Sequence, residues 1–161
     1  MSIHVGQRIP EVTLKRIGNG LETVDTVALF EGRKAVLFAV PGAFTPTCSA
    51  RHLPGYVELF DQFRARGIEV MCMAVNDAFV MQAWGQAQSV PAGLQMLSDG
   101  NAELTRALGL ELDASASGMG LRSRRFALYV VDGVVAAAFV ETPGQFEVSS
   151  AQQVLAAIDA L

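Results

Sequence analysis

The sequence is short of the residues that cross-link a fold or charge a surface. The chain has 161 residues, of which 17% are charged and two, Cys48 and Cys72, are cysteines. Two thiols in a domain of this size do not make the disulfide framework of a secreted scaffold, so a reducing cytoplasm is the expected setting. The C-x-x-C pair of thiol–disulfide oxidoreductases is missing too, because Arg51 stands where the second cysteine would be.

Several binding classes are excluded by what else is absent. The net charge is −4 and no block of Lys or Arg stands out, so we expect neither nucleic acid nor an anionic membrane as a partner. No apolar run approaches the roughly 18 residues of a membrane span, and residues 1–6 lack the charged and apolar regions of a secretory signal. With only His4 and His52 to add imidazole ligands, no metal site is expected.

What the chain has in quantity is apolar side chains. Hydrophobic residues make up 51% of it, which is enough to build the core of a single domain spanning residues 1–161. Because so few residues are charged, some apolar surface should remain outside that core. We therefore expect an oligomer interface.

The periodicity predicts strands and helices in alternation. Strands are expected at residues 12–17, 21–27, 35–40, 68–75, 94–97, 124–131 and 134–140. Helices are expected at residues 28–32, 45–66, 78–88 and 102–108, with a last one capped by Ser149 or Ser150. Pro54 should kink the second helix, and residues 111–123 are expected to form an irregular loop. This order predicts an α/β fold, a mixed central β-sheet with helices on both faces.

The stretch from Pro41 to Cys48 links a central strand to a helix. Thr45 is a favourable N-cap, since its hydroxyl can accept from the first-turn amides, and Pro46 then takes the first helical position. Cys48 falls inside the first turn, where the positive end of the helix dipole lowers the pKa of a thiol. The alternative is that Cys48 is a small buried apolar residue.

The spacing Pro41-x-x-x-Thr45-x-x-Cys48 resembles the P-x-x-x-T-x-x-C signature of the peroxiredoxins. Further segments resemble the type II, peroxiredoxin 5-like branch: residues 42–49, 52–56, 75–80, 124–126 and 131–135. Residues 146–150 resemble those of bacterial glutathione-dependent members. The resemblance covers essentially the whole chain. It implies a thioredoxin-like fold, a homodimer, no cofactor, and a peroxidase that reduces hydrogen peroxide and alkyl hydroperoxides.

The resemblance also implies a role for each matched residue. Cys48 would be the peroxidatic nucleophile, whose thiolate attacks one peroxide oxygen and becomes a sulfenic acid. Thr45 would hold peroxide or thiolate through its hydroxyl, unless it only caps the helix. Pro41 would shield the sulfur from water. Arg125 would place a permanent positive charge beside the thiolate, and these four residues together would bind the substrate.

Arg125 is favoured over its neighbours by its place before a strand. It directly precedes Phe126, as the family's arginine does, whereas alternation turns Arg124 the other way. The alternative is that these arginines and Arg122 form a solvated basic edge. His52 lies one helical turn after the cysteine, and packing or an interface is a simpler role for it than base catalysis.

The thiol that regenerates Cys48 is left open by the sequence. Cys72 sits in an apolar strand and is expected to be inert; to resolve a Cys48 sulfenic acid it would need local unfolding of the helix start. Residues 146–150 contain no cysteine. An external thiol is therefore expected, glutathione with or without glutaredoxin, with thioredoxin as the second choice. The alternative from another class is a non-catalytic redox sensor or binding module.

Overall fold

The computed structural model describes residues 2–161. Its strands are β1 (Thr13–Gly18), β2 (Gly20–Asp25), β3 (Lys34–Ala39), β4 (Ile68–Ala74), β5 (Gln95–Ser98), β6 (Glu111–Asp113), β7 (Leu121–Ser123), β8 (Phe126–Val131) and β9 (Val134–Val140). Its helices are α1 (Thr26–Phe30), α2 (Leu53–Glu58), α3 (Phe60–Ala65), α4 (Ala78–Ala87), α5 (Glu103–Leu108) and α6 (Ala151–Asp159), with a π-helical turn η1 (Cys48–His52) and a 3-10 turn η2 (Ser115–Ser117). Among residues 2–161, no helix combines the length and the apolar character needed to cross a membrane.

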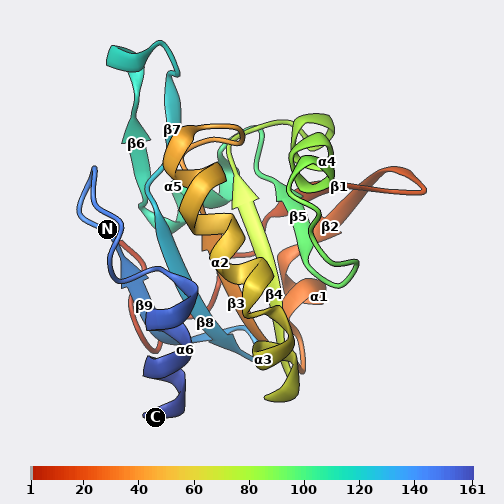
Figure 1. The fold of residues 1–161 in the computed structure, drawn as a ribbon, viewed down its shortest axis with the longest axis vertical. Coiled ribbons are helices and arrows are strands. Elements are labelled where there is room, and N and C mark those ends of the chain that lie inside the picture. The colour runs from red at the N-terminus through yellow and green to blue at the C-terminus, as the bar shows by residue number, and fades with distance from the viewer. Residues whose placement is uncertain (1) are drawn as a thin grey trace.

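Seven strands form one mixed sheet, in the order β2-β1-β5-β4-β3-β8-β9. β3, β4 and β5 run parallel to one another. β8 lies antiparallel to β3, and β9 lies antiparallel to β8. The predicted mixed sheet is confirmed, and β3, which is apolar from Ala35 onward, lies inside it, with β4 on one side and β8 on the other (Figure 1).

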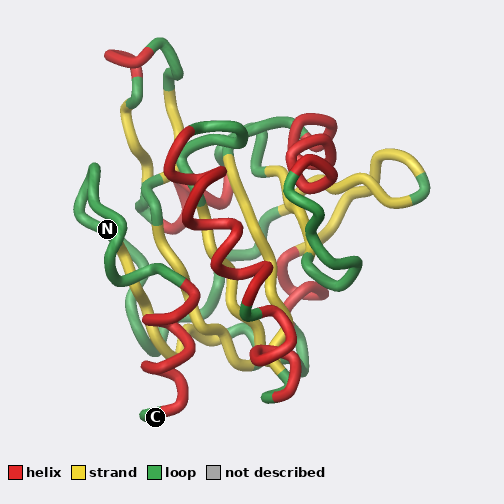
Figure 2. The backbone as a smooth tube through the Cα atoms, viewed as in Figure 1, coloured by secondary structure: helices red, strands yellow, loops and turns green. Residues whose placement is uncertain are grey.

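Alternate residues of β3 enter two separate cores. Phe38 packs in the cluster covered by η1, α2, α3, α4 and α6, whereas Leu37 packs in the cluster covered by α1 and α5. Both side chains are completely buried. Figure 2 shows the helical path of η1, α2 and α3, in red, crossing in front of the strands. Helices on both faces explain why this strand has no polar side.

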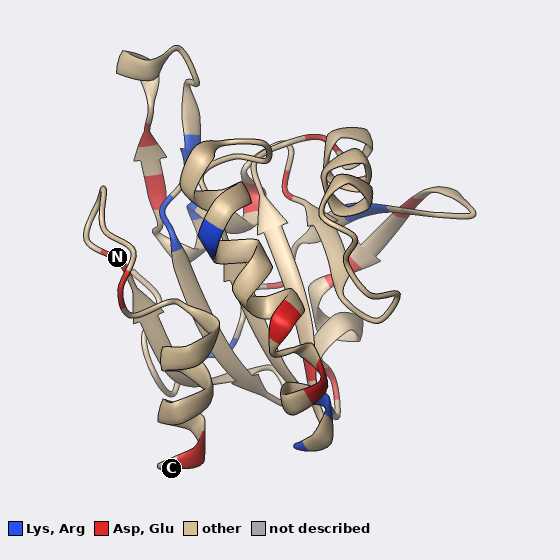
Figure 3. Cartoon of the chain, viewed as in Figure 1, with Lys and Arg blue, Asp and Glu red and all other residues tan. Residues whose placement is uncertain are grey.

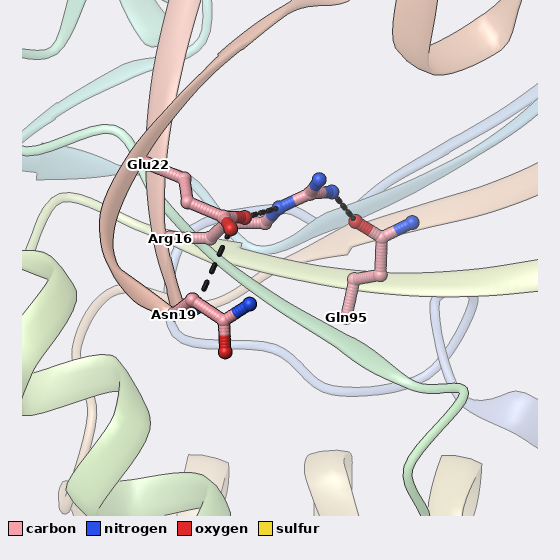
Figure 4. A network of polar contacts seen from close by, with 4 residues as sticks. All are labelled: Arg16, Asn19, Glu22 and Gln95. Carbon is pink, nitrogen blue, oxygen red and sulfur yellow. Dashed lines mark hydrogen bonds and ion pairs between the residues drawn. The ribbon is translucent and has the colours of Figure 1, made fainter.

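A polar network holds the β1–β2 hairpin on the sheet edge (Figure 4). Arg16 donates from Nε to Glu22 Oε1 at 3.0 Å and from Nη1 to Gln95 Oε1 of β5 at 2.7 Å. Glu22 Oε2 accepts from the Asn19 amide at 3.4 Å. The hydrogen bond from Arg16 lowers the pKa of the Glu22 carboxyl. The network therefore links three strands on the side of the sheet away from β8.

Residues 111–123 do not form the irregular loop that the sequence predicted. β6 and β7 pair antiparallel, with Leu112 opposite Arg122, and make a two-stranded sheet of their own. This hairpin projects from the top of the molecule in Figure 1. The pattern was missed because each strand has three residues, too few for alternation to be recognised.

The helix expected at residues 45–66 is divided, and Pro54 does more than kink it. In the π-turn η1 the Leu53 amide donates to the Cys48 carbonyl, one residue beyond the usual α-helical partner. α2 follows with Pro54 in its first turn, and the path is interrupted again at Leu59. A proline has no amide hydrogen and excludes the carbonyl four residues earlier, so the helix widens just before it.

Candidate active site

Strand pairing brings the candidate residues to one edge of the sheet. β3 and β8 run antiparallel with Ala39 opposite Phe126. The chain therefore leaves β3 toward Pro41 at the edge where Arg125 enters β8. The parallel strands β4 and β5 end at the same edge. Ligand sites in open α/β sheets collect at this carboxyl edge.

Cys48 lies at the beginning of the helix that leaves this edge. Its side chain is 1% exposed and packs in the apolar cluster below η1. Within residues 2–161, neither its amide nor that of Thr47 donates to an acceptor. The first turn of a helix leaves such amides unpaired, so these N–H groups are available beside the sulfur.

The Thr45 hydroxyl does not cap the helix, and this part of the sequence prediction is wrong. The hydroxyl donates to the Gly42 carbonyl at 2.7 Å. The Thr45 backbone carbonyl accepts from the Ser49 amide at 2.9 Å, which is the bond expected of the residue at the N-cap position of a helix. Phe44 has a φ of 64°, and the tight turn built on this left-handed residue directs the hydroxyl back to its own loop. The hydroxyl is thereby oriented, with its lone pairs left to accept.

Arg125 contacts the sulfur directly. Its Nη2 donates to Cys48 Sγ at 3.2 Å, and its Nη1 lies 2.8 Å from His52 Nδ1. The planar guanidinium makes both contacts at once. Arg124 instead donates to the Glu141 carbonyl at 2.8 Å. The structure therefore brings Cys48 together with Arg125 and not with the preceding arginine.

His52 holds Arg125 in place. Its ring is completely buried. Burial, and secondly the Arg125 charge, lower the pKa of His52 from 6.5 to about 3, although the bond to Ser149 opposes the shift. The imidazole is therefore neutral. Nε2 lies 3.1 Å from the Ser149 carbonyl, which can only accept, so Nε2 carries the hydrogen and Nδ1 accepts from Arg125.

The C-terminal loop anchors this histidine. The Ser149 carbonyl also accepts from the Tyr56 hydroxyl at 2.8 Å. Glu141 Oε2 accepts from the Ser149 amide at 2.8 Å, from its hydroxyl at 2.7 Å and from the Glu147 amide at 2.8 Å. Burial would raise the pKa of Glu141, but the hydrogen bonds from Ser149, Glu147 and Val148 outweigh it and lower that pKa. An ionised carboxylate thus supports the loop behind His52.

The sequence analysis placed His52 one helical turn from Cys48 but gave it a packing or interface role, and it gave Ser149 and Glu141 no role in the site. The spacing of four residues between Cys48 and His52 was a signal, since it places the two side chains one helical turn apart. No comparable local signal exists for Ser149 and Glu141. They meet His52 because the C-terminal loop packs against η1, a contact between segments far apart in the chain.

Two further contacts support the segment that carries Cys48. Trp84 Nε1 of α4 donates to Ser49 Oγ at 3.0 Å. Asn76, two residues after the end of β4, accepts through Oδ1 from the Ala43 amide at 2.9 Å. Trp84 is completely buried. The loop and the helix start are therefore held from the side of α4 as well as from the C-terminal loop.

Cys72 lies in the interior of β4, opposite Phe38 of β3. It is completely buried, and both cysteines are free thiols. Burial, with the Cys48 sulfur as a smaller cause, raises the pKa of the Cys72 thiol well above its ordinary value. A buried thiol that stays protonated is a poor nucleophile.

A cavity of about 350 Å³ opens beside the site. Its wall includes Pro41, Thr47, Arg125 and Phe146. A larger cavity of about 580 Å³ lies between α4 and β5, and neither cysteine lines it. Within residues 2–161, no group of three His, Cys, Asp or Glu side chains is placed to hold a metal ion.

Comparison of the sequence with known proteins assigns the chain to a family. Residues 4–155 match the family model described as Redoxin. Peroxiredoxin-2B of Arabidopsis thaliana is 44% identical, over 97% of this chain and 98% of its own. Peroxiredoxin-2E-2, chloroplastic, of Oryza sativa is 49% identical, over 98% of this chain and 73% of its own. The chain belongs to the peroxiredoxin family.

Solved structures agree with this assignment. The reduced Prx3 of Vibrio vulnificus in complex with H2O2 is 50% identical, covers 97% of this chain and 99% of its own, and superposes with a TM-score of 0.93. The thioredoxin-like fold expected from the sequence is therefore confirmed. So is the expected enzyme class: this peroxiredoxin is a thiol peroxidase, an oxidoreductase.

The buried neutral imidazole predicts that this peroxiredoxin loses stability in acid. His52 takes up a proton near pH 6.5 when unfolded and near pH 3 when folded. Between these values the unfolded state binds more protons, so the free energy of unfolding should fall by several kcal/mol as the pH is lowered from about 6.5 to about 3. Urea denaturation over a series of pH values measures this slope.

A variant and a control separate His52 from other titrating groups. His52→Gln offers an oxygen acceptor to Arg125 but does not titrate, so it should lose less stability across the window. His4→Gln changes an exposed histidine and should keep the wild-type slope. Equal slopes in wild type and His52→Gln would show that the imidazole is not the group concerned.

Proposed function

We propose that Cys48 is the peroxidatic cysteine of this peroxiredoxin. The observation that carries the proposal is the 3.2 Å contact from Arg125 Nη2 to Cys48 Sγ, because a permanent positive charge stabilises the sulfur anion that attacks peroxide. The thiolate forms a bond to the hydroxyl oxygen of R–O–O–H and the O–O bond breaks. The sulfur is oxidised to a sulfenic acid, and the departing RO⁻ takes a proton to leave as an alcohol, or as water from hydrogen peroxide.

The neighbours of Cys48 support the same step. The proton of the Thr45 hydroxyl points at Gly42, so its oxygen is left to accept the peroxide O–H. Arg125 and the unpaired Cys48 amide are the donors that we propose for the developing negative charge on the leaving oxygen. Pro41 lines the cavity beside them and would limit the water that reaches the sulfur. The four residues together would bind the peroxide.

We further propose that an external thiol regenerates Cys48, with glutathione, alone or with glutaredoxin, as the reductant. The resemblance to bacterial type II members supports this choice, and the burial of Cys72 argues against internal resolution. A first thiolate attacks the sulfenic sulfur and water leaves, which gives a mixed disulfide. A second thiolate attacks the reductant's sulfur in that disulfide, which releases the Cys48 thiolate and leaves a disulfide between the two reducing thiols.

Mass spectrometry after one equivalent of hydrogen peroxide tests the two cysteine roles. Glutathione added next should appear on Cys48 and not on Cys72. Cys48→Ser should abolish peroxide consumption, whereas Cys72→Ser should turn over near the wild-type rate. A Cys48–Cys72 disulfide in the wild type would contradict the external route. Turnover with thioredoxin but not with glutathione, with or without glutaredoxin, would contradict the choice of reductant.

Conservative substitutions test the two groups beside the sulfur. Arg125→Lys keeps the charge but not the two-pronged geometry, so the rate constant for Cys48 oxidation should fall by about 10²-fold. Thr45→Val should slow it about tenfold, and Thr45→Ser should recover most of that loss. Stopped-flow fluorescence of Trp84, which is bonded to Ser49, follows the reaction. Arg106→Lys, at an exposed position on α5, is the control, and a wild-type rate in Arg125→Lys would refute the role of the guanidinium.

We also propose a homodimer through the surface beside this loop. Phe44 is 56% exposed and Phe79 is 62% exposed. The hydrogen bond between Ala43 and Asn76 holds their segments together. Exposed aromatic side chains on adjoining segments favour an interface, and residues 111–123 extend from the same edge of the sheet.

Sedimentation velocity tests this interface. The wild type should sediment as a dimer, and Phe79→Glu should shift it to a monomer because a charge would be buried at the contact. Val27→Glu is the matched control, since Val27 is 49% exposed but belongs to α1 on the other face of the sheet. A wild-type monomer, or equal behaviour of the two variants, would contradict the proposed surface.

A further inference from the structure

Three arginines line the cavity beside Pro41: Arg51 of η1, and Arg124 and Arg125 at the start of β8. Figure 3 shows the corresponding blue segments on the helix after Cys48 and on the stretch between β7 and β8. Within residues 2–161 none of the three forms an ion pair. The ion pairs of the described chain lie elsewhere: Arg16–Glu22, Arg33–Glu69 and Arg66–Asp159. In a chain of net charge −4 the cavity is a local concentration of positive charge.

Glu141 lies in the same wall, but within the described chain its carboxylate forms no ion pair with these arginines. Glu141 Oε2 accepts from the amides of Glu147 and Ser149 and from the Ser149 hydroxyl. Arg124 donates to the backbone carbonyl of Glu141, not to its carboxylate. Among the described residues, Glu141 supplies the one carboxylate in the cavity wall, and its hydrogen bonds are made to its own loop.

Arg125 is committed to the catalytic site, whereas the other two arginines have donors to spare. Arg51 lies over the Phe146 ring, with Cζ 4.8 Å from the ring centroid, and donates no hydrogen bond within the described chain. Arg124 donates from Nη2 alone, and its buried Nε has no partner in residues 2–161. A guanidinium has five N–H donors, and burying one of them without an acceptor, as at Arg124 Nε, is unfavourable. This wall of the cavity therefore presents N–H donors that have no hydrogen-bond acceptor in residues 2–161.

The remaining wall of the cavity is largely apolar. It includes Leu112, Met119, Pro143 and Phe146. Arg125 also lies against the Phe146 ring, with Cζ 5.7 Å from the centroid, so this ring adjoins both the catalytic arginine and Arg51. An apolar wall next to unpaired guanidinium groups suits a ligand with an anionic end and an apolar body.

We infer that Arg51 and Arg124 form a carboxylate-binding subsite next to Cys48. The inference rests on the proposed function and names the class of molecule that the site takes: an organic hydroperoxide, or a reducing thiol, that carries a carboxylate. Guanidinium groups bind a carboxylate through paired charge-assisted hydrogen bonds. The bound carboxylate leaves the peroxide or thiol end of the same molecule free to reach the sulfur past Pro41 and Arg125.

Matched acids and esters test this subsite, on two arms that separate the sources of the carboxylate. On the peroxide arm, single-turnover oxidation of Cys48 by cumene hydroperoxide bearing a para-carboxylate is compared with oxidation by its methyl ester. On the thiol arm, reduction of the Cys48 sulfenic acid by glutathione is compared with reduction by glutathione diethyl ester. We expect the acid to react about tenfold faster than the ester on the arm that supplies the carboxylate. The acid-to-ester ratio should fall severalfold in Arg51→Gln and in Arg124→Gln, and it should shrink with added salt.

The matched control is Arg64→Gln. Arg64 is also exposed and lies over an aromatic ring, 5.9 Å from the centroid of Phe60, but it belongs to α3 and does not line this cavity, so the ratio should stay at the wild-type value. Arg51 is exposed too, so Arg51→Gln provides a folded variant even if Arg124→Gln does not fold. A ratio near one on both arms in the wild type, or a ratio unchanged in the arginine variants, overturns the subsite.

A separate assay distinguishes failure of the carboxylate subsite from failure of the proposed peroxidase function. Hydrogen peroxide and dithiothreitol are both uncharged, and turnover with this pair reports on Cys48 alone. Absence of that turnover would mean that the proposed function fails. Turnover with this pair, together with no preference for the acids, would overturn the carboxylate subsite and leave the peroxidase intact.

Discussion

The site depends on one guanidinium group shared between a sulfur and a neutral imidazole. Arg125 reaches Cys48 with one nitrogen because His52 accepts from the other. A protonated imidazole would have no lone pair to offer and would repel the arginine. Burial keeps the ring neutral, and this neutrality is the condition that orients the charge at the sulfur.

The support for that histidine comes from the C-terminal loop, not from its own helix. Ser149 accepts from the ring, and Glu141 holds Ser149 through its amide and hydroxyl. Each of these donors has its acceptor in place in the folded chain, so Arg125 is already held beside Cys48 Sγ. The same packing gives two neighbouring arginines different partners. Arg125 donates to the Cys48 sulfur. Arg124 donates from one guanidinium nitrogen to the Glu141 carbonyl, and its other guanidinium N–H groups have no partner in residues 2–161.

Features that depend on neighbours along the chain were predictable from the sequence. The apolar run of β3 marked a strand with both faces covered. Asp77 directly precedes the helix predicted at residues 78–88 and is a residue type that favours the N-cap, and its carboxylate accepts from the Val80 amide at 2.8 Å. The predicted strands at residues 124–131 and 134–140 are separated by Asp132 and Gly133, a pair typical of a tight hairpin turn, and both residues have positive φ. Propensity, capping and strand period are short-range properties, so a single sequence carries them.

The sequence by itself thus determined that Cys48 lies at the beginning of a helix. Which arginine approaches it followed from the resemblance to the family, with alternation turning Arg124 the other way. Only the tertiary structure decided the partners of the polar groups. It turned the Thr45 hydroxyl onto Gly42 and gave His52 a carbonyl and a guanidinium as partners. It also paired residues 111–123 into a hairpin. The reason is physical: whether a buried polar group is charged, and to what it bonds, depends on segments that meet only after the chain has folded.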